Sequence, residues 1–252
     1  GAVPRALRAR AAAEIMDPLH LSGEQVGFVR FASPSEPTPR LDMMGGEFCL
    51  NATRAFAALL AREGCLNASG PDRWSGSVEV SGADGPVAVR VRRVPAFHAP
   101  AGWTAGAGLS FKTSRPSVVK ENASLIRVPG IAHILLTDVL PAACAELRAR
   151  FDLDAEDAVG CLWLDTRSDP PILYPVVWVR ATQSLCTESA CGSGTLACAL
   201  ALRARCGDSR FAIRQPGGDV LTVSFEPETD TPPQIGKTRL VWVDGPVRFV
   251  AE

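Results

Sequence analysis

The chain carries one short pattern twice, at Gly46-Glu47-Phe48-Cys49-Leu50-Asn51-Ala52-Thr53 and at Ser189-Ala190-Cys191-Gly192-Ser193-Gly194-Thr195. In each stretch a cysteine precedes a short turn of mostly small or polar residues, and a segment rich in Ala and Leu follows. Apolar residues recur at helical spacing after the first cysteine, and Gly64 is a typical C-terminal cap. The pattern therefore predicts two helices, each beginning directly after a cysteine.

The surroundings of the two cysteines repeat as well. Each predicted helix ends in a Cys/Gly pair, at Gly64-Cys65 and at Cys206-Gly207. A β-hairpin is predicted after each pair, over residues 77–94 and 211–225, because alternating segments flank Gly-containing turns. We expect two similar halves in which a pseudo-twofold arrangement brings the two cysteines face to face across a cleft.

The rest of the chain is interpreted from periodicity and turn residues. Residues 6–16 and 141–151 are predicted to be helical, and strands are predicted at 24–31, 125–128, 133–136, 161–165, 172–180, 240–243 and 247–250. The Gly/Pro/Ser-rich region 95–116 is predicted to be the domain boundary. We therefore expect an N-terminal domain of residues 1–115 and a C-terminal domain of residues 116–252, whose last strand could return to the first domain.

Composition limits the classes of partner. The chain has 252 residues, and 26 basic side chains oppose 27 acidic ones, for a formal net charge of −1. This balance makes nucleic acid and anionic membranes poor candidates. No apolar run reaches the roughly 20 residues that cross a bilayer, and the N-terminal segment has no signal-like apolar region. The eight cysteines form no Cys-x-x-Cys pair, so we expect free thiols and a cytoplasmic location.

The position of Cys49 and Cys191 suggests acid–base chemistry. The positive end of a helix dipole lowers the pKa of a thiol from about 8.5. The first helical turn also offers unpaired N–H groups that can hold a carboxylate. Two such elements face to face could remove a proton α to a carboxylate on one side and return it on the other, which is racemisation. One thiol would start ionised as the base and the other protonated as the acid.

Other interpretations of the cysteines remain open. Free cysteine often acts as a small buried hydrophobe, and we interpret five of the eight in this way: Cys65, Cys144, Cys161, Cys198 and Cys206. A metal site made of Cys186, Cys191, Cys198 and Cys206 is disfavoured, because the spacing is irregular and three of them are expected on or beside a single helix. We expect no metal and no cofactor.

Further stretches extend the pattern to nearly the whole chain: Glu24-Gln25-Val26-Gly27-Phe28, Gln183-Ser184-Leu185 and Gln215-Pro216-Gly217-Gly218. With the two cysteine stretches, they resemble the diaminopimelate epimerase family of cofactor-independent amino-acid racemases. These stretches look most similar to those of the histidine racemases that supply D-histidine for opine-type metallophores such as staphylopine. The resemblance implies an α+β fold of two similar domains, each a curved β-sheet around a central helix, with the site between them.

The resemblance also implies roles for particular residues. Cys49 and Cys191 match the catalytic pair. His133 falls where the family has an active-site histidine, and Glu24 matches an acidic residue of the histidine racemases. The residues expected to bind the substrate come from the two helix starts: Leu50, Asn51, Gly192, Ser193, Gly194 and Thr195. Such an enzyme is expected to act on a small amino acid and to form a homodimer.

The sequence departs from the diaminopimelate epimerases where those enzymes hold the far end of their substrate. Ile131 and Ala132 replace an Asn-Pro pair, and Thr182-Gln183-Ser184 replaces Glu-Arg-Gly. Burying a second zwitterion without partners costs several kcal/mol, so histidine or another compact amino acid is the expected substrate.

Two further positions depart from the family. Leu50 replaces a glycine and adds bulk beside the first thiol. The family's first strand has no counterpart before Ala2, so we expect this chain to be part of something longer.

Several functions remain alternatives to histidine racemisation. Diaminopimelate epimerase is one, and the proline-racemase group shares this style of paired-cysteine motif. A non-catalytic module that binds amino acids would need the helix amides but not two thiols. An isomerase of the phenazine-biosynthesis type would not need both cysteines either.

Overall fold

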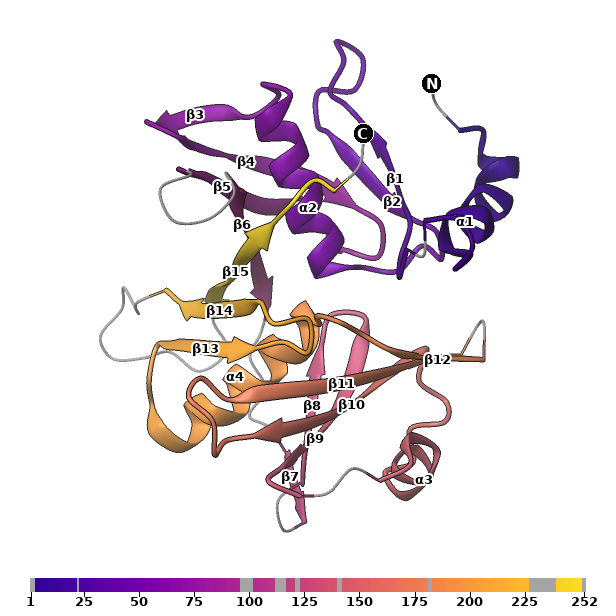
Figure 1. Cartoon of the computed structure of the whole chain (residues 1–252), viewed down its shortest axis with the longest axis vertical. Helices are drawn as coiled ribbons and strands as arrows, with labels where there is room; N and C mark the ends of the chain where they lie inside the picture. Colours follow the sequence, from indigo (N-terminus) through magenta and orange to yellow (C-terminus); the bar gives the residue numbers. More distant parts are fainter. Residues whose placement is uncertain are drawn as a thin grey trace. The chain divides into compact units, whose positions relative to one another are not determined.

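The computed structural model describes residues 3–21, 23–95, 102–111, 117–120, 123–139, 142–180, 183–226 and 239–250. The chain divides into two units (Figure 1): unit 1 holds Gly1–Ala107 and Pro246–Glu252, and unit 2 holds Gly108–Gly245. The predicted boundary between residues 115 and 116 lies outside the described residues.

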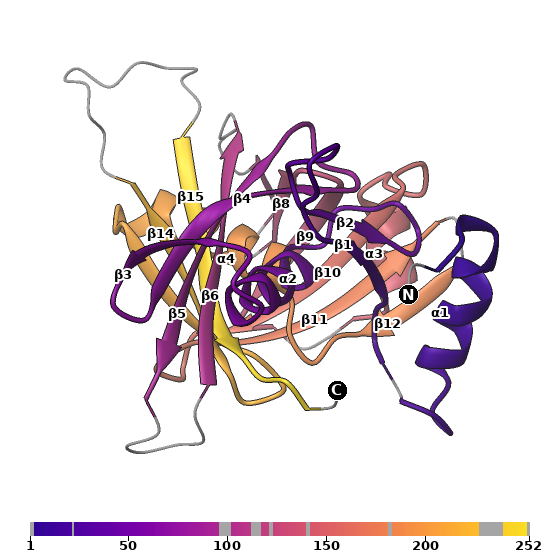
Figure 2. The ribbon, with the colours of Figure 1, turned by 90° about the horizontal axis from the view of Figure 1, so that it is seen from above.

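Helix α2, Leu50–Arg62, lies against the sheet of unit 1 (Figure 2). Its apolar face is buried because apolar residues recur three or four positions apart: Leu50, Phe56, Ala57, Leu60 and Ala61. The helix packs on the hairpin of β4 (Arg73–Val80) and β5 (Val87–Val94). Alternate valines of the hairpin are buried, as expected for strands with one face on a core: Val78, Val80, Val87, Val89 and Val91.

The remaining elements of unit 1 extend this sheet. The strand order is β1-β2-β4-β5-β6, with β3 paired to β4. The bounds are β1 Gly27–Arg30, β2 Arg40–Met43, β3 Asn67–Gly70 and β6 Gly102–Phe111. A 3-10 turn, Arg5–Leu7, leads into α1, Arg8–Met16. Arg8 joins this helix to the sheet through an ion pair with Asp42 of β2.

Unit 2 is a larger sheet of order β15-β14-β13-β11-β10-β9-β8-β7, with β12 paired to β11. Its strands are β7 Ser117–Lys120, β8 Ala123–Val128, β9 Ile131–Thr137, β10 Ala158–Asp165, β11 Ile172–Val179, β12 Ser184–Thr187, β13 Arg210–Arg214, β14 Val220–Phe225 and β15 Arg239–Val247. Helix α4, Gly192–Cys206, packs across several of these strands and ends at Gly207 in the left-handed region.

The sheet of unit 2 has a different neighbour on each face. On one face Ala132, Ile134, Cys161 and Trp163 form a core with Leu147 of α3, Cys144–Arg150. Side chains alternate between faces along a strand, so His133, Leu135 and Leu162 lie on the opposite face. That face carries α4, because a Cβ at Gly194 of α4 would lie 3.0 Å from Leu162 Cδ2.

The predicted α+β architecture is confirmed, and both hairpins and both helices after the cysteines are present. The region 95–116, predicted to be the domain boundary, contains a strand that was not predicted, β6, because Trp103 and alternating small residues can pack in a sheet despite the glycines. Two expectations are wrong. The two closing strands are one, β15, and residues 248–250 are not in a strand. Cys144 and Cys161 form a disulfide rather than remaining free thiols, since register and packing place α3 over β10.

No helix among the described residues is long and apolar enough to cross a membrane.

Candidate active site: two cysteine-capped helices

Cys49 is the N-cap of α2. Its backbone is extended, with φ −122° and ψ 112°, and its Sγ accepts a hydrogen bond from the N–H of Ala52 at 3.4 Å. Thr53 closes the first turn from the other side, because its N–H and its hydroxyl both donate to the Cys49 carbonyl, at 3.0 and 2.7 Å. The thiol takes the place of the oxygen that Ser or Asp normally supplies at an N-cap. Cys49 is buried, with 9% of its surface exposed.

Cys191 is the N-cap of α4 and repeats this geometry. Its φ is −128° and its ψ is 106°, and its Sγ accepts a hydrogen bond from the N–H of Gly194 at 3.3 Å. Thr195 donates to the Cys191 carbonyl from its N–H at 2.9 Å and from its hydroxyl at 2.6 Å. The same local structure therefore occurs once in each unit, and in both the sulfur lies at the positive end of a helix.

The two helix starts differ in the residue that follows the cysteine, which is Gly192 in unit 2 and Leu50 in unit 1. A Cβ at Gly194 would lie 3.0 Å from Cys191 Sγ as well as from Leu162, so a side chain there would disturb the thiol. Gly192 is buried, and the half-buried Ser193 hydroxyl lies 3.6 Å from Cys191 Sγ. In unit 1 the equivalent of Gly192 is Leu50, which is buried with 3% exposure. Its extra bulk is therefore packed into unit 1.

Gln215 fixes the second helix start, and sequence reasoning noted it only as part of a matching stretch. Its side chain is 1% exposed. Oε1 accepts the Cys191 N–H at 2.9 Å, while Nε2 donates to the Thr195 hydroxyl at 3.0 Å and to the Ile213 carbonyl at 3.2 Å. Both polar groups of Thr195 are thus engaged around Cys191. The predicted contact of Thr195 with substrate remains a prediction, and its observed contacts position the cysteine.

The pKa of Cys191 is raised, contrary to the lowering expected from the helix dipole. Burial is the largest cause, and the Glu188 carboxylate adds to it by charge repulsion with the thiolate and by a hydrogen bond that favours the thiol. Ser193 and the Gly194 N–H act in the opposite direction but do not outweigh these effects. Glu188 was not predicted from the sequence, because an acidic residue in a polar stretch is normally solvated. Burial and the Glu188 carboxylate together favour the protonated thiol of Cys191.

Replacing Glu188 by glutamine should therefore lower the pKa of Cys191 and speed its alkylation by iodoacetamide at neutral pH, by roughly threefold to tenfold for a shift of up to about one unit. The labelled site can be read by tandem mass spectrometry. Asp208→Asn, which removes one exposed carboxylate beyond the end of α4, should leave the rate unchanged. An unaltered rate in the Glu188 variant would contradict the assigned cause.

His133 is entirely buried in β9, opposite Gly160 of β10 in the parallel register. Gly160 makes room for it, because a Cβ there would overlap the imidazole ring. Among the described residues neither ring nitrogen has a hydrogen-bond partner, and burial lowers the pKa of His133 to about 3. The ring is therefore neutral near pH 7. It lies on the sheet face that carries α4, the helix that Cys191 caps.

The predicted acidic residue, Glu24, is exposed in the segment before β1. Its neighbour Gln25 makes the direct contact with the first cysteine, since Cys49 Sγ donates to Gln25 Oε1 at 2.8 Å. The Glu24-Gln25 stretch therefore lies beside Cys49. Gln25, for which no role was predicted, makes the contact with the thiol.

Arg54 holds the first turn of α2, and sequence reasoning missed it because arginine is common on exposed helix faces. Here it is 4% exposed. Its guanidinium donates to the Ala105 carbonyl at 3.0 Å, to Asn51 Oδ1 at 2.9 Å and to the Pro246 carbonyl at 3.1 Å. The amide oxygen of Asn51 is therefore engaged, and the chain returning at Pro246 is tied to α2.

Arg54→Met should destabilise the protein by about 3 kcal/mol, because buried acceptors lose a charged donor. Urea unfolding of the full chain, followed by circular dichroism, measures this change. Arg10→Met is the control: the Arg10 side chain is 82% exposed and pairs with Glu14 one turn away, which is worth at most about 0.5 kcal/mol. Equal losses in the two variants would contradict the role given to Arg54.

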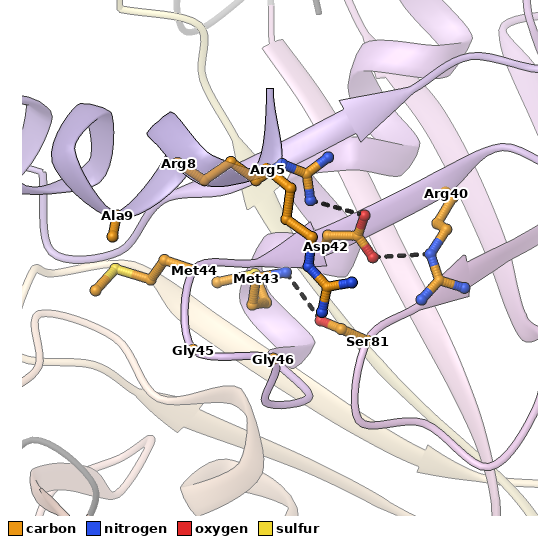
Figure 3. A pocket seen from close by; sticks show the side chains of 10 residues that line it. All are labelled: Arg5, Arg8, Ala9, Arg40, Asp42, Met43, Met44, Gly45, Gly46 and Ser81. Carbon is orange, nitrogen blue, oxygen red and sulfur yellow. Dashed lines mark hydrogen bonds and ion pairs between the residues drawn. The ribbon is translucent and has the colours of Figure 1, made fainter. Parts of the chain in front are cut away.

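A cavity of about 600 Å³ in unit 1 borders the segment that leads to Cys49. Figure 3 shows Asp42 between Arg8 and Arg40, whose guanidinium groups lie 3.1 and 2.7 Å from its carboxylate. Burial alone would raise the pKa of Asp42, but the hydrogen bonds from Arg40 and Arg8 outweigh it and the pKa is lowered. The Ser81 hydroxyl accepts a hydrogen bond from the Met43 N–H and donates one to the Glu47 carbonyl, and so holds the segment between Met43 and Glu47 in place. These contacts position the approach to Cys49.

Solved structures share this fold. The solved structure of a protein described as a predicted epimerase of Pseudomonas aeruginosa superposes on this chain with a TM-score of 0.60 and 15% sequence identity. The superposition covers all of this chain and 91% of the Pseudomonas chain. A hydroxyproline epimerase from Agrobacterium vitis gives a TM-score of 0.57 and 14% identity, over 97% of this chain and 77% of that one. At these identities the likeness concerns the fold alone.

Relatives with named activities indicate the class of enzyme. A histidine racemase of Fusobacterium nucleatum subsp. nucleatum is 29% identical over 256 residues, which cover 95% of this chain and 84% of the relative. A histidine racemase of Staphylococcus aureus is 25% identical over 86% of this chain and 79% of its own length. Fold and relatives together define an isomerase of the amino-acid racemase class. A family model described as "Histidine racemase CntK N-terminal domain" matches residues 1–252, and the chain belongs to that family.

Proposed function

We propose that this racemase interconverts L- and D-histidine with two thiols, Cys49 and Cys191, and without a cofactor. The observation that carries the proposal is the repeated N-cap: in each unit a buried cysteine sulfur accepts an N–H from the first turn of a helix. A binding module would need only the helix amides. Two thiols in equivalent positions suit a reaction that requires a base on one side and an acid on the other.

The substrate carboxylate would bind at the helix starts. Backbone N–H groups in the first turn have no acceptor within their own helix, and the residues beside each cysteine contribute them: Leu50 and Asn51 in unit 1, Gly192 and Ser193 in unit 2. The positive end of each helix favours an anion. A carboxylate held at either helix start would place its α-carbon near the sulfur atom of that helix, and the helix end would also stabilise the negative charge that develops when the α-proton leaves.

The raised pKa of Cys191 suggests which thiol begins as the acid. Burial and Glu188 keep Cys191 protonated, so Cys49 is the base in the resting enzyme. Its thiolate takes the α-proton of one enantiomer and the Cys191 thiol protonates the carbanion from the opposite side. The products are the other enantiomer, a Cys49 thiol and a Cys191 thiolate. The reverse turnover, or exchange with solvent, restores the starting state.

Histidine is favoured as substrate by what the relatives act on and by the uncharged residues that precede His133 in the sequence. Two relatives are named histidine racemases. Ile131 and Ala132 precede His133 and offer no charged side chain to a distal ammonium or carboxylate. Imidazole is largely neutral above pH 6.5 and can be buried with a single hydrogen bond at modest cost. His133, neutral and within the unit of Cys191, and Glu24 are the proposed further site residues.

The setting of the enzyme is proposed on the same basis. D-Histidine would serve the synthesis of an opine-type metallophore, and the enzyme would act in the cytoplasm as a homodimer. We also propose that the two units, Gly1–Ala107 with Pro246–Glu252 and Gly108–Gly245, are two domains.

Chiral chromatography of L-histidine incubated with the purified protein, with and without EDTA and without added pyridoxal phosphate, tests the proposed function. The enantiomers should approach equal amounts, because racemisation has an equilibrium constant of one. A protein that leaves L-histidine unchanged but converts another amino acid would disprove the proposed substrate. Inhibition by EDTA would disprove the cofactor-independent mechanism.

A further inference from the structure

A neutral amide, that of Gln25, accepts a hydrogen bond from the first thiol. Cys49 Sγ lies 2.8 Å from Gln25 Oε1 in a geometry in which the thiol donates, and the N–H of Ala52 points at the same sulfur from 3.4 Å. An amide has a carbonyl that accepts and an NH₂ group that donates, at nearly equal distances from the chain. The terminal torsion of a glutamine side chain is broad and roughly two-fold. A half-turn therefore exchanges the acceptor for the donor.

Such an exchange matters only at a sulfur that ionises. A thiol donates to Oε1, whereas a thiolate has no proton and would face the oxygen lone pairs. After a half-turn, Nε2–H donates to the thiolate. Gln25 is exposed, so packing does not lock its amide in one orientation. Gln215, by contrast, is 1% exposed, and its amide is fixed by hydrogen bonds at both ends.

We propose that Gln25 is a positioning residue for Cys49 whose amide reverses its hydrogen bond when the thiol ionises, and so supports both protonation states of the sulfur. The proton itself moves between Cys49 and its reaction partner; the amide only turns. Cys191 has a similar neighbour, since the Ser193 hydroxyl, 3.6 Å away, can donate or accept. The use of this reversal in catalysis rests on the proposed racemisation, in which each cysteine alternates between base and acid.

The test is the pH dependence of iodoacetamide labelling at Cys49, because only the thiolate reacts. Trypsin releases Cys49 in the peptide of residues 41–54, which contains no other cysteine. Gln25→Glu keeps the shape but leaves a group that can only accept and that repels a thiolate. Its labelling profile should move to higher pH by about one unit, which slows labelling about tenfold on the rising limb. Gln25→Met removes donor and acceptor together and should move the profile by less than half as much.

Asn67→Asp provides a matched control, because it adds one carboxylate at an exposed position of β3 in the same unit. Its profile should overlay that of the wild type. The proposal is overturned if the Gln25→Glu profile also overlays the wild type, or if Gln25→Met or Asn67→Asp moves it as far as Gln25→Glu does. Thermal unfolding of each variant confirms that the fold is retained.

A second readout concerns turnover. In Gln25→Glu, the acidic limb of kcat for racemisation should move to higher pH while KM stays within about twofold, since the thiolate and not the substrate contact is affected. An unmoved limb would overturn the catalytic use of the reversal. If the wild type does not racemise histidine, the proposed function fails, whereas the labelling profiles still decide the role of Gln25.

Discussion

Replacing Cys49 by alanine, and separately Cys191 by alanine, should each lower kcat for racemisation about a thousandfold or more, which corresponds to about 4 kcal/mol. A site with one thiol can remove a proton from one face of the α-carbon but cannot deliver one to the opposite face. Substrate binding should remain, because the first-turn N–H groups that hold the carboxylate belong to the backbone. Initial rates from chiral chromatography and binding by calorimetry measure the two quantities.

The two helices also supply matched controls for this experiment. Cys65 follows the end of α2, Cys206 ends α4, and both are exposed free cysteines. Their alanine variants should keep the full rate. If Cys49→Ala or Cys191→Ala retains more than about a tenth of wild-type turnover, a loss below about 1.4 kcal/mol, the two-thiol mechanism is wrong.

The second large effect is the preference between substrates. The enzyme should use L-histidine with a kcat/KM about a thousandfold or more above that for LL-diaminopimelate. A site without partners for a second zwitterion must desolvate that ammonium and carboxylate unpaired, whereas sites that do pair a distal group discriminate by orders of magnitude. This expectation rests on the sequence, in which Ile131 and Ala132 stand before His133 where the diaminopimelate epimerases have Asn-Pro.

Both substrates should be compared at one pH and one enzyme concentration, with proline as a third amino acid. Proline tests the proline-racemase alternative, because a shared fold does not decide between proline and histidine as the substrate. A higher kcat/KM for diaminopimelate or proline than for histidine would reject the substrate assignment. Negligible values for all three would leave an amino-acid racemase whose substrate is another amino acid.

Much of the fold follows from short-range patterns. The two hairpins and the helices after Cys49 and Cys191 were predictable because alternation, helical spacing and a C-terminal glycine are local signals. Strand β6 was not, because its run of Gly, Ala and Thr resembles a loop until Trp103 and its neighbours are placed in a sheet. The Cys144–Cys161 disulfide was missed for a similar reason, since only the packing of α3 over β10 brings those residues together.

The candidate site divides in the same way. Cys49 and Cys191 were identifiable from their position before a helix, and the structure confirms that each is an N-cap. The groups that tune them could not be identified. Gln25, Glu188 and Gln215 interact with the two cysteines in the folded chain. These contacts depend on the course of the intervening loops, which local sequence patterns do not predict. The pKa of Cys191 is raised rather than lowered, because burial and the neighbouring Glu188 carboxylate outweigh the helix dipole.

The central claim is that two different groups take and return the α-proton. The most direct measurement is racemisation of L-histidine in D₂O, stopped at low conversion, with the deuterium content of each enantiomer determined after chiral separation. The account predicts that the D-histidine formed carries deuterium at Cα, delivered by a thiol that has exchanged with solvent, while the remaining L-histidine keeps its protium. D-Histidine that retains the original α-proton, or L-histidine that gains deuterium as fast as D-histidine forms, would contradict the two-thiol account.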